Sequence, residues 1–178
     1  TSTFSIINDG GDDLNWDINL VDYSGASFDS TSTQVFIENG ATTLHSFDVS
    51  EVAATGDGSI TIGIFGDFND PLENAQVFIE GQALGSQIYA PDNECLDMHY
   101  ETFDLTLESL EEWIDDGVIE VTIENSISVG AGQGSCDGEH SVQVNFPVNY
   151  IPSWLTVSPE NGYTVLGDTS TVVVSFDT

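Results

Sequence analysis

The sequence predicts an all-β protein, an antiparallel β-sandwich of the immunoglobulin-like kind with one short helix. Three observations lead to this fold class. Polar and apolar residues alternate with a period of two along most of the chain, as they do in strands with one buried face. Turn-forming Gly, Asn, Asp and Pro residues separate these runs at short and fairly even intervals, which is typical of antiparallel sandwiches. A single segment has helical character.

The strands follow one another along the whole chain. The first is predicted over 3–7 and ends at the turn residues 8–11, and the second runs over 14–20 with its apolar residues on one face. Further strands are expected over 34–38, 45–49, 59–65, 75–80, 87–90, 102–107, 118–124, 141–146, 155–157 and 171–176. The pentapeptide Gln-Val-Phe-Ile-Glu occurs at 34–38 and again at 76–80. A duplicated hairpin would explain it, but the flanks diverge, which favours a common strand pattern repeated by chance.

The helical segment is predicted over 109–117. Ser109 and Glu112 match a capping box, and Gly117 is a natural stop. Its apolar residues can face a sheet, so we expect a turn of helix that closes one end of a sandwich.

The charge composition excludes several classes of function. The chain has no Lys or Arg and 31 Asp and Glu residues, a formal net charge of −31. An average domain of this length would have roughly twenty basic residues. Without them no surface can neutralise phosphates, so nucleic acid and anionic membranes are not expected partners. The 39% hydrophobic content, spread along the chain, excludes a disordered acidic tail.

The two ends of the chain together resemble a known family. The start contains Phe4-x-Ile6-x-Asn8-x-Gly10 and Leu14-x-Trp16-x-Ile18, and the finish contains Pro152-Ser153-Trp154-Leu155-Thr156-Val157-Ser158-Pro159 followed by Gly162 and Gly167. This pattern is similar to the BACON-like immunoglobulin-like sandwich domains of secreted and surface bacterial proteins. The resemblance implies that Trp16 and Trp154 fill the space between two sheets. In that family a short stretch separates the two pieces, whereas more than a hundred residues separate them here.

The resemblance implies a split domain. Residues 1–48 and 147–178 would form one immunoglobulin-like sandwich, and residues 49–146 would form a second, inserted sandwich. The inserted part is loosely similar to galactose-binding-like modules, which have a jelly-roll fold. The alternative is one continuous sandwich with extra strands.

Calcium is the expected cofactor, because carboxylates without cationic partners need cations from solution and Ca²⁺ takes six to eight oxygen ligands. The predicted ligands are Asp67, Asn69, Asp70 and Glu73 in one turn, joined by Glu80. The segments 9–13 and 92–97 are weaker candidates. None matches an EF-hand loop, and the alternative for each is a solvated acidic loop.

Cys95 and Cys136 are the two cysteines. We expect a disulfide between them, which together with the acidity favours a secreted or cell-surface setting. Because each is followed four residues later by a histidine, His99 or His140, a metal site of two Cys and two His ligands is an alternative, and free thiols are another.

Catalysis is not expected, because the sequence has no nucleophile elbow and no Lys or Arg to orient a substrate. The predicted function is a non-catalytic extracellular structural or adhesive protein, a filament subunit or a repeat of a large surface protein. Its partners would be copies of itself or neighbouring repeats, joined by strand complementation. The alternative is a calcium-dependent carbohydrate-binding module, with glycans as partners of exposed tyrosines at 23, 89, 100, 150 or 163. A tyrosine at a strand end is more often a half-buried lid on the core.

Overall fold

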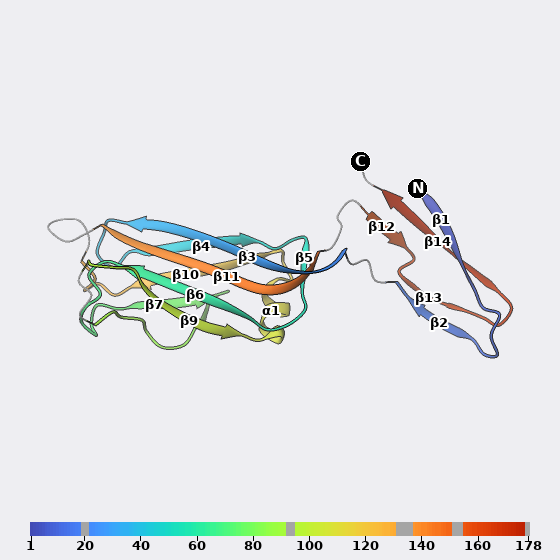
Figure 1. The fold of residues 1–178 in the computed structure, drawn as a ribbon, viewed down its shortest axis with the longest axis horizontal. Coiled ribbons are helices and arrows are strands. Elements are labelled where there is room, and N and C mark those ends of the chain that lie inside the picture. The colour runs from blue at the N-terminus through green and yellow to red at the C-terminus, as the bar shows by residue number, and fades with distance from the viewer. Residues whose placement is uncertain (19–21, 92–94, 131–136, 151–154, 177–178) are drawn as a thin grey trace. The chain divides into compact units, whose positions relative to one another are not determined.

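The computed structural model describes residues 1–18, 22–91, 95–130, 137–150 and 155–176, and these residues form an almost entirely β structure (Figure 1). The pairs of strands are antiparallel, and the predicted all-β fold class with one short helix is confirmed. No helix of the described part is long and apolar enough to cross a membrane. The elements are β1 (Ser2–Ile7), β2 (Leu14–Asp17), β3 (Asp22–Phe36), β4 (Thr42–Asp48), β5 (Val52–Ala54), β6 (Gly58–Phe65), β7 (Ala75–Ile79), β8 (Gln82–Ala83), β9 (His99–Leu105), α1 (Leu107–Trp113), β10 (Val118–Asn125), β11 (Gly138–Tyr150), β12 (Leu155–Ser158), β13 (Asn161–Thr164) and β14 (Thr169–Phe176).

The chain divides into two compact units. The smaller joins the two ends of the chain, Thr1–Ser24 and Asn149–Thr178, and the larger is Gly25–Val148. The sequence predicted a terminal unit of 1–48 plus 147–178. The end of its first piece is wrong, because residues 25–48, which hold most of β3 and all of β4, belong to the larger unit. The reason is strand pairing: β4 pairs with β10 and β3 neighbours β11, which places both strands in the sheets of the larger unit.

The larger unit is a sandwich of two sheets. One has the strand order β4-β10-β7-β8, and the other has the order β3-β11-β6-β9 with β5 paired to β11. Alternate residues of the central strands point inward, so that Ile60, Ile62 and Ile64 of β6 and the facing residues of β10 are almost fully buried. The hydrophobic core of the described residues lies in this unit.

The helix α1 lies at one end of the larger unit, beside β5 (Figure 1). It buries Leu110 completely, as expected for a helix that closes a sandwich. Its start was predicted three residues too late. Thr106, and not Ser109, is the N-cap, and its side chain accepts a hydrogen bond from the Ser109 N–H. Gly117 ends the segment with a positive φ of 85°, as predicted.

The smaller unit has a three-stranded sheet in the order β1-β14-β12 and a β2–β13 pair. Trp16 lies across Gly162, the residue directly opposite on β13, where an added Cβ would sit 2.3 Å from the indole ring. The Trp16 Nε1–H donates to Thr164 Oγ1 at 2.9 Å. Asn8 is buried and donates to the carbonyls of Asp12 and Thr164. These motif residues are therefore structural; Trp154 lies outside the described residues.

The predicted strands do not include β5, β8 or β13, and elsewhere they differ from the structure most at β3 and at 87–90. β3 is fifteen residues long, whereas only its last three residues fell within a predicted strand. The segment 87–90 forms a single bridge between Ile88 and Ala75 instead of a strand. The many Ser and Thr residues of β3 give a weak alternation signal, and at 87–90 pairing with a neighbouring strand, not the local pattern, decides the outcome.

Candidate functional site

The predicted calcium turn is closed by hydrogen bonds between its own residues. Asp70 Oδ1 accepts from the Leu72 N–H at 2.9 Å, and Glu73 Oε2 accepts from the Asp70 N–H at 3.1 Å. The Glu73 N–H donates in turn to the Asp70 carbonyl. Two of the predicted ligands therefore shape the turn that precedes β7, and in this arrangement their oxygens are partly occupied by N–H donors.

Glu80 does not join that turn. It follows β7, while the turn precedes it, and the five residues of that strand span about 17 Å. The Glu80 Oε1 accepts from the Glu120 N–H at 2.6 Å on the neighbouring strand β10. Across the described ranges, no three His, Cys, Asp or Glu side chains form a group that could hold a metal ion. Calcium binding stays a prediction. Its candidate ligands are now the residues of the turn at 67–73, without Glu80.

The acidic segment 9–13 also has internal partners. The carboxylate of Asp13 accepts hydrogen bonds from the Tyr163 hydroxyl and from the Leu166 N–H. These two donors lower the pKa of Asp13, the Tyr163 hydroxyl contributing most. This carboxylate ties β2 to β13 and the turn after it. In the segment 92–97, residues 92–94 lie outside the described part of the chain.

The structure does not describe Cys136, so the bond partner of Cys95 is not described either. Cys95 is not a free thiol. The disulfide between Cys95 and Cys136 therefore stays a prediction. Strand order disfavours the alternative metal site. His99 of β9 and His140 of β11 pair with Ile64 of β6 from its two sides, so their backbones are two strand spacings, about 10 Å, apart.

A buried hydrogen-bonded chain links the two sheets of the larger unit. It runs from Ser32 of β3 through His45 and Thr43 of β4 to His140 of β11 and Asn125 of β10, with heavy-atom distances of 2.8–3.1 Å. In a neutral His140 ring whose Nε2–H donates to Asn125 Oδ1, the Nδ1 atom accepts from the Thr43 hydroxyl. The Thr43 oxygen then accepts from His45 Nε2–H, and His45 Nδ1 accepts from the Ser32 hydroxyl.

Burial keeps both rings neutral. The two histidines are fully buried. Burial, and then the proximity of His45, lower the pKa of His140 to about 3. Burial also lowers the pKa of His45, against an opposing backbone hydrogen bond at Ser32. Such a network fixes how the sheets stack and has no open face for a substrate, so we assign it a structural role.

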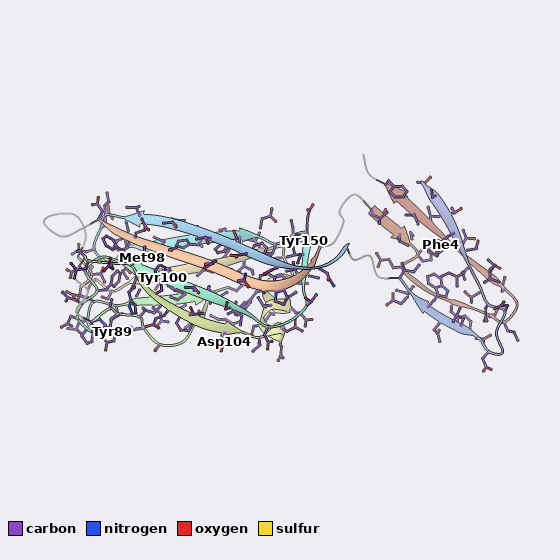
Figure 2. All side chains as sticks on the ribbon, in the orientation of Figure 1. Phe4, Tyr89, Met98, Tyr100, Asp104 and Tyr150 are labelled. Carbon is purple, nitrogen blue, oxygen red and sulfur yellow. The ribbon has the colours of Figure 1, made fainter. Side chains whose placement is uncertain are left out.

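The sheet β1-β14-β12 differs from the rest of the molecule in charge. Its strands have six, eight and four residues, and none of them is Asp or Glu. β1 is an edge strand, with β14 as its partner among the described strands. Its residues are almost all exposed, and they include Phe4 at 42% and Ile7 at 65% (Figure 2 labels Phe4). Uncharged, exposed edge strands are the ones that accept a further strand.

One hydrogen bond fixes which backbone groups of β1 face the free edge. The Asn8 N–H donates to the Asp168 carbonyl, just beyond the pair Ile7 and Thr169. Because N–H directions alternate along an antiparallel strand, the even-numbered residues of β1 point toward β14. The N–H and C=O groups of Thr3, Ser5 and Ile7 therefore point away from β14, toward the open side.

The outward face of β9, β6 and β11 holds a second distinct surface. Their register places nine outward-facing residues in three rows across the sheet. The rows are Tyr100, Gly63 and Ser141, then Thr102, Thr61 and Gln143, then Asp104, Ser59 and Asn145. We name these nine residues the tyrosine face. Eight of the nine residues are uncharged. Ile60, Ile62 and Ile64 alternate with the β6 members and point into the core.

Tyr100 lies over Gly63 on this face. A Cβ at Gly63 would be 2.8 Å from Tyr100 Cε1 and 3.1 Å from the Met98 sulfur, so the glycine makes the room that the ring occupies. Tyr100 remains 58% exposed, the highest value among the tyrosines whose exposure is described (Figure 2). Tyr100 is one of five tyrosines that the sequence offers as candidates. A lone glycine within the apolar run 60–65 was the signal that could have singled it out.

Comparisons with known proteins add little to this geometry. No family model and no curated protein sequence matches the chain. Among solved structures, the crystal structure of dimeric latent PorU from Porphyromonas gingivalis aligns with 88% of this chain at 11% identity and a TM-score of 0.36. The chain spans 20% of the length of that PorU chain. The resemblance of the two chain ends to BACON-like domains stays a prediction.

Proposed function

We propose that the protein is a non-catalytic extracellular structural or adhesive protein whose copies associate through the open edge of β1. One observation supports this most: a chain with a net charge of −31 has a three-stranded sheet without a single carboxylate, and that sheet ends in an exposed edge strand. Copies repel one another over most of their surface, and the repulsion is smallest where two such edges meet.

The arrangement of apolar residues in the smaller unit supports the same proposal. Among its described residues, Val157 and Val172 are the buried hydrophobics, whereas Phe4, Leu14, Ile7, Val173 and Phe176 are between 37% and 65% exposed. An added strand at β1 extends the sheet and covers part of this apolar surface. Pairing of two β1 edges would give a dimer, whereas pairing of β1 with β12, the other edge of the same sheet, in the next copy would give a filament or an array of surface repeats.

Cations from solution belong to the same proposal. The 31 carboxylates have no Lys or Arg partner in the chain, so bound or screening cations must reduce their repulsion. Calcium is the proposed ion because it prefers carboxylate and carbonyl oxygens. Association is therefore expected to be stronger in millimolar calcium than in chelator.

The test is a proline at the open edge. Ser5→Pro removes an N–H that points away from β14, so it leaves the β1–β14 hydrogen bonds in place. Ser5→Ala is the matched control, because it removes the hydroxyl and keeps the N–H. By light scattering and electron microscopy in calcium, we expect assemblies of the wild type and Ser5→Ala, and monomers of Ser5→Pro. A wild type that stays monomeric, or a Ser5→Pro variant that assembles equally well, contradicts the proposal.

A further inference from the structure

We propose that the tyrosine face is a binding site for a neutral polysaccharide. This inference concerns the larger unit and does not depend on association through β1. It gives a place and a ligand class to the carbohydrate-binding alternative that the sequence left open among five tyrosines.

The centre of the site is the ring of Tyr100. The Cδ1–Cε1 edge of the ring lies against Gly63, which limits how the ring can move, and 58% of the residue is open to solvent. An exposed aromatic ring held in place offers a flat apolar surface with a polar hydroxyl at its end. The C–H groups on one side of a pyranose ring form a matching apolar surface, and the sugar hydroxyls around it need hydrogen-bonding partners.

The rest of the face supplies those partners. From Tyr100 to Asp104 the rows extend about 13 Å along the strands, and the three strands span about 10 Å across them. Every position apart from Gly63 carries a hydroxyl, an amide or a carboxylate. This is the mixture of donors and acceptors that fixes the orientation of a bound polar ligand, and its length suits a short stretch of a sugar chain.

Two of the polar pairs are already in place. Thr61 and Thr102 share a hydrogen bond of 2.9 Å across β6 and β9. The Gln143 Nε2 donates to Asp29 Oδ1 of β3 at 2.9 Å, which leaves the Gln143 carbonyl oxygen as an acceptor. Side chains that are held before the ligand arrives lose less conformational entropy when it binds.

Charge decides which polysaccharide fits. No Lys or Arg lies on the face or elsewhere in the chain, and Asp104 gives the face a negative end. A uronic acid, a sulfated glycan or a phosphate would be repelled by the protein as a whole. A neutral sugar chain meets no such barrier, and its hydroxyls can donate to the Asp104 carboxylate.

The probes are four soluble neutral polysaccharides, hydroxyethyl cellulose, laminarin, galactomannan and arabinoxylan, with polygalacturonate as the acidic comparison. Binding is measured for the full chain by affinity electrophoresis and then by calorimetry. We expect retardation by at least one neutral polymer and none by polygalacturonate. Binding is direct, so it persists in chelator, and it persists in Ser5→Pro, which separates it from the association proposed above.

The variants locate the site. Tyr100→Ala is expected to weaken binding at least tenfold, while Tyr100→Phe, which keeps the ring, loses less than threefold. Gln143→Ala removes only an outward-facing amide and is expected to weaken binding by threefold to tenfold, and it tests the site even where Tyr100→Ala lowers stability. Tyr89→Ala, an exposed tyrosine outside the face, is the control and is expected to bind as the wild type does.

Three results would overturn the proposal. The first is the absence of binding to all four neutral polymers. The second is unchanged affinity in both Tyr100→Ala and Gln143→Ala. The third is binding that chelator abolishes, or that polygalacturonate supports equally, because either would place recognition on bound cations and not on this face.

Discussion

The buried histidines predict that the larger unit loses stability as the pH falls from 7 to 5. The folded-state pKa of His140 is about 3, whereas an unfolded histidine titrates near 6.5. The unfolded state therefore binds the proton first, and stability that is fully present above pH 6.5 is lost as the pH falls toward 3. A protonated His140 ring would also donate from Nδ1, so that the Thr43 hydroxyl could no longer donate to it and would have to reorient.

The size of the loss follows from the two pKa values. Proton linkage for His140 alone gives a loss of about 2 kcal/mol between pH 7.5 and pH 5. His45 acts in the same direction, because its folded-state pKa is also lowered. The wild type and His140→Gln are compared over the same window, so the difference between their losses isolates His140.

Urea denaturation at constant ionic strength, followed by circular dichroism and tryptophan fluorescence, measures the effect. His140→Gln removes the titrating ring and keeps an amide, so its loss between pH 7.5 and 5 should be about 2 kcal/mol smaller than that of the wild type. Leu110→Ala, which lowers stability without removing a titrating ring, is the control and should keep the wild-type slope. Equal stability of the wild type at both pH values would refute the reasoning.

Four further predictions concern packing, cations and proteolysis. Gly162→Ala, whose Cβ would sit 2.3 Å from the Trp16 ring, should destabilise the smaller unit by about 1–3 kcal/mol in thermal melts, and an unchanged melt would contradict the packing. Leu110→Ala should cost the larger unit about 2–5 kcal/mol in urea, because the side chain is fully buried. Calcium at millimolar concentration should raise the melting temperature above that in chelator and above that in sodium chloride of equal ionic strength; three superimposed melts would reject a specific calcium site. Trypsin should leave the chain intact even in urea, because it has no Lys or Arg, and fragments by mass spectrometry would contradict this.

The repeated pentapeptide shows that a local sequence pattern can predict a strand without predicting which of its faces is buried. At 34–38 the residue Phe36 is buried and Val35 and Ile37 are exposed, whereas at 76–80 Val77 and Ile79 are buried. The same five residues therefore face the core in opposite registers. One lies at the end of an edge strand and the other in a strand inside its sheet, so the neighbouring strands, and not the pattern, choose the buried face.

The fold class could be predicted because period-two alternation reports one buried face, and it does so for β4, β10 and β11. The unit boundary could not, because it depends on which distant strands pair. The same limit applies to the acidic residues: Glu80 is seven residues from Glu73 in sequence, but an intervening strand carries it away. The position of Tyr100 opposite Gly63 could not be predicted either, because it depends on which residues of β6 and β9 pair.

Protection of backbone amides on β1 tests the central claim most directly. Hydrogen exchange is allowed to proceed in dilute protein and in concentrated protein with calcium, then quenched and read by NMR after dissociation. Strand addition predicts that the amides of Thr3, Ser5 and Ile7 exchange rapidly when dilute and become protected when concentrated, while those of Phe4 and Ile6 are protected in both. Rapid exchange at Thr3, Ser5 and Ile7 at every concentration would contradict the account.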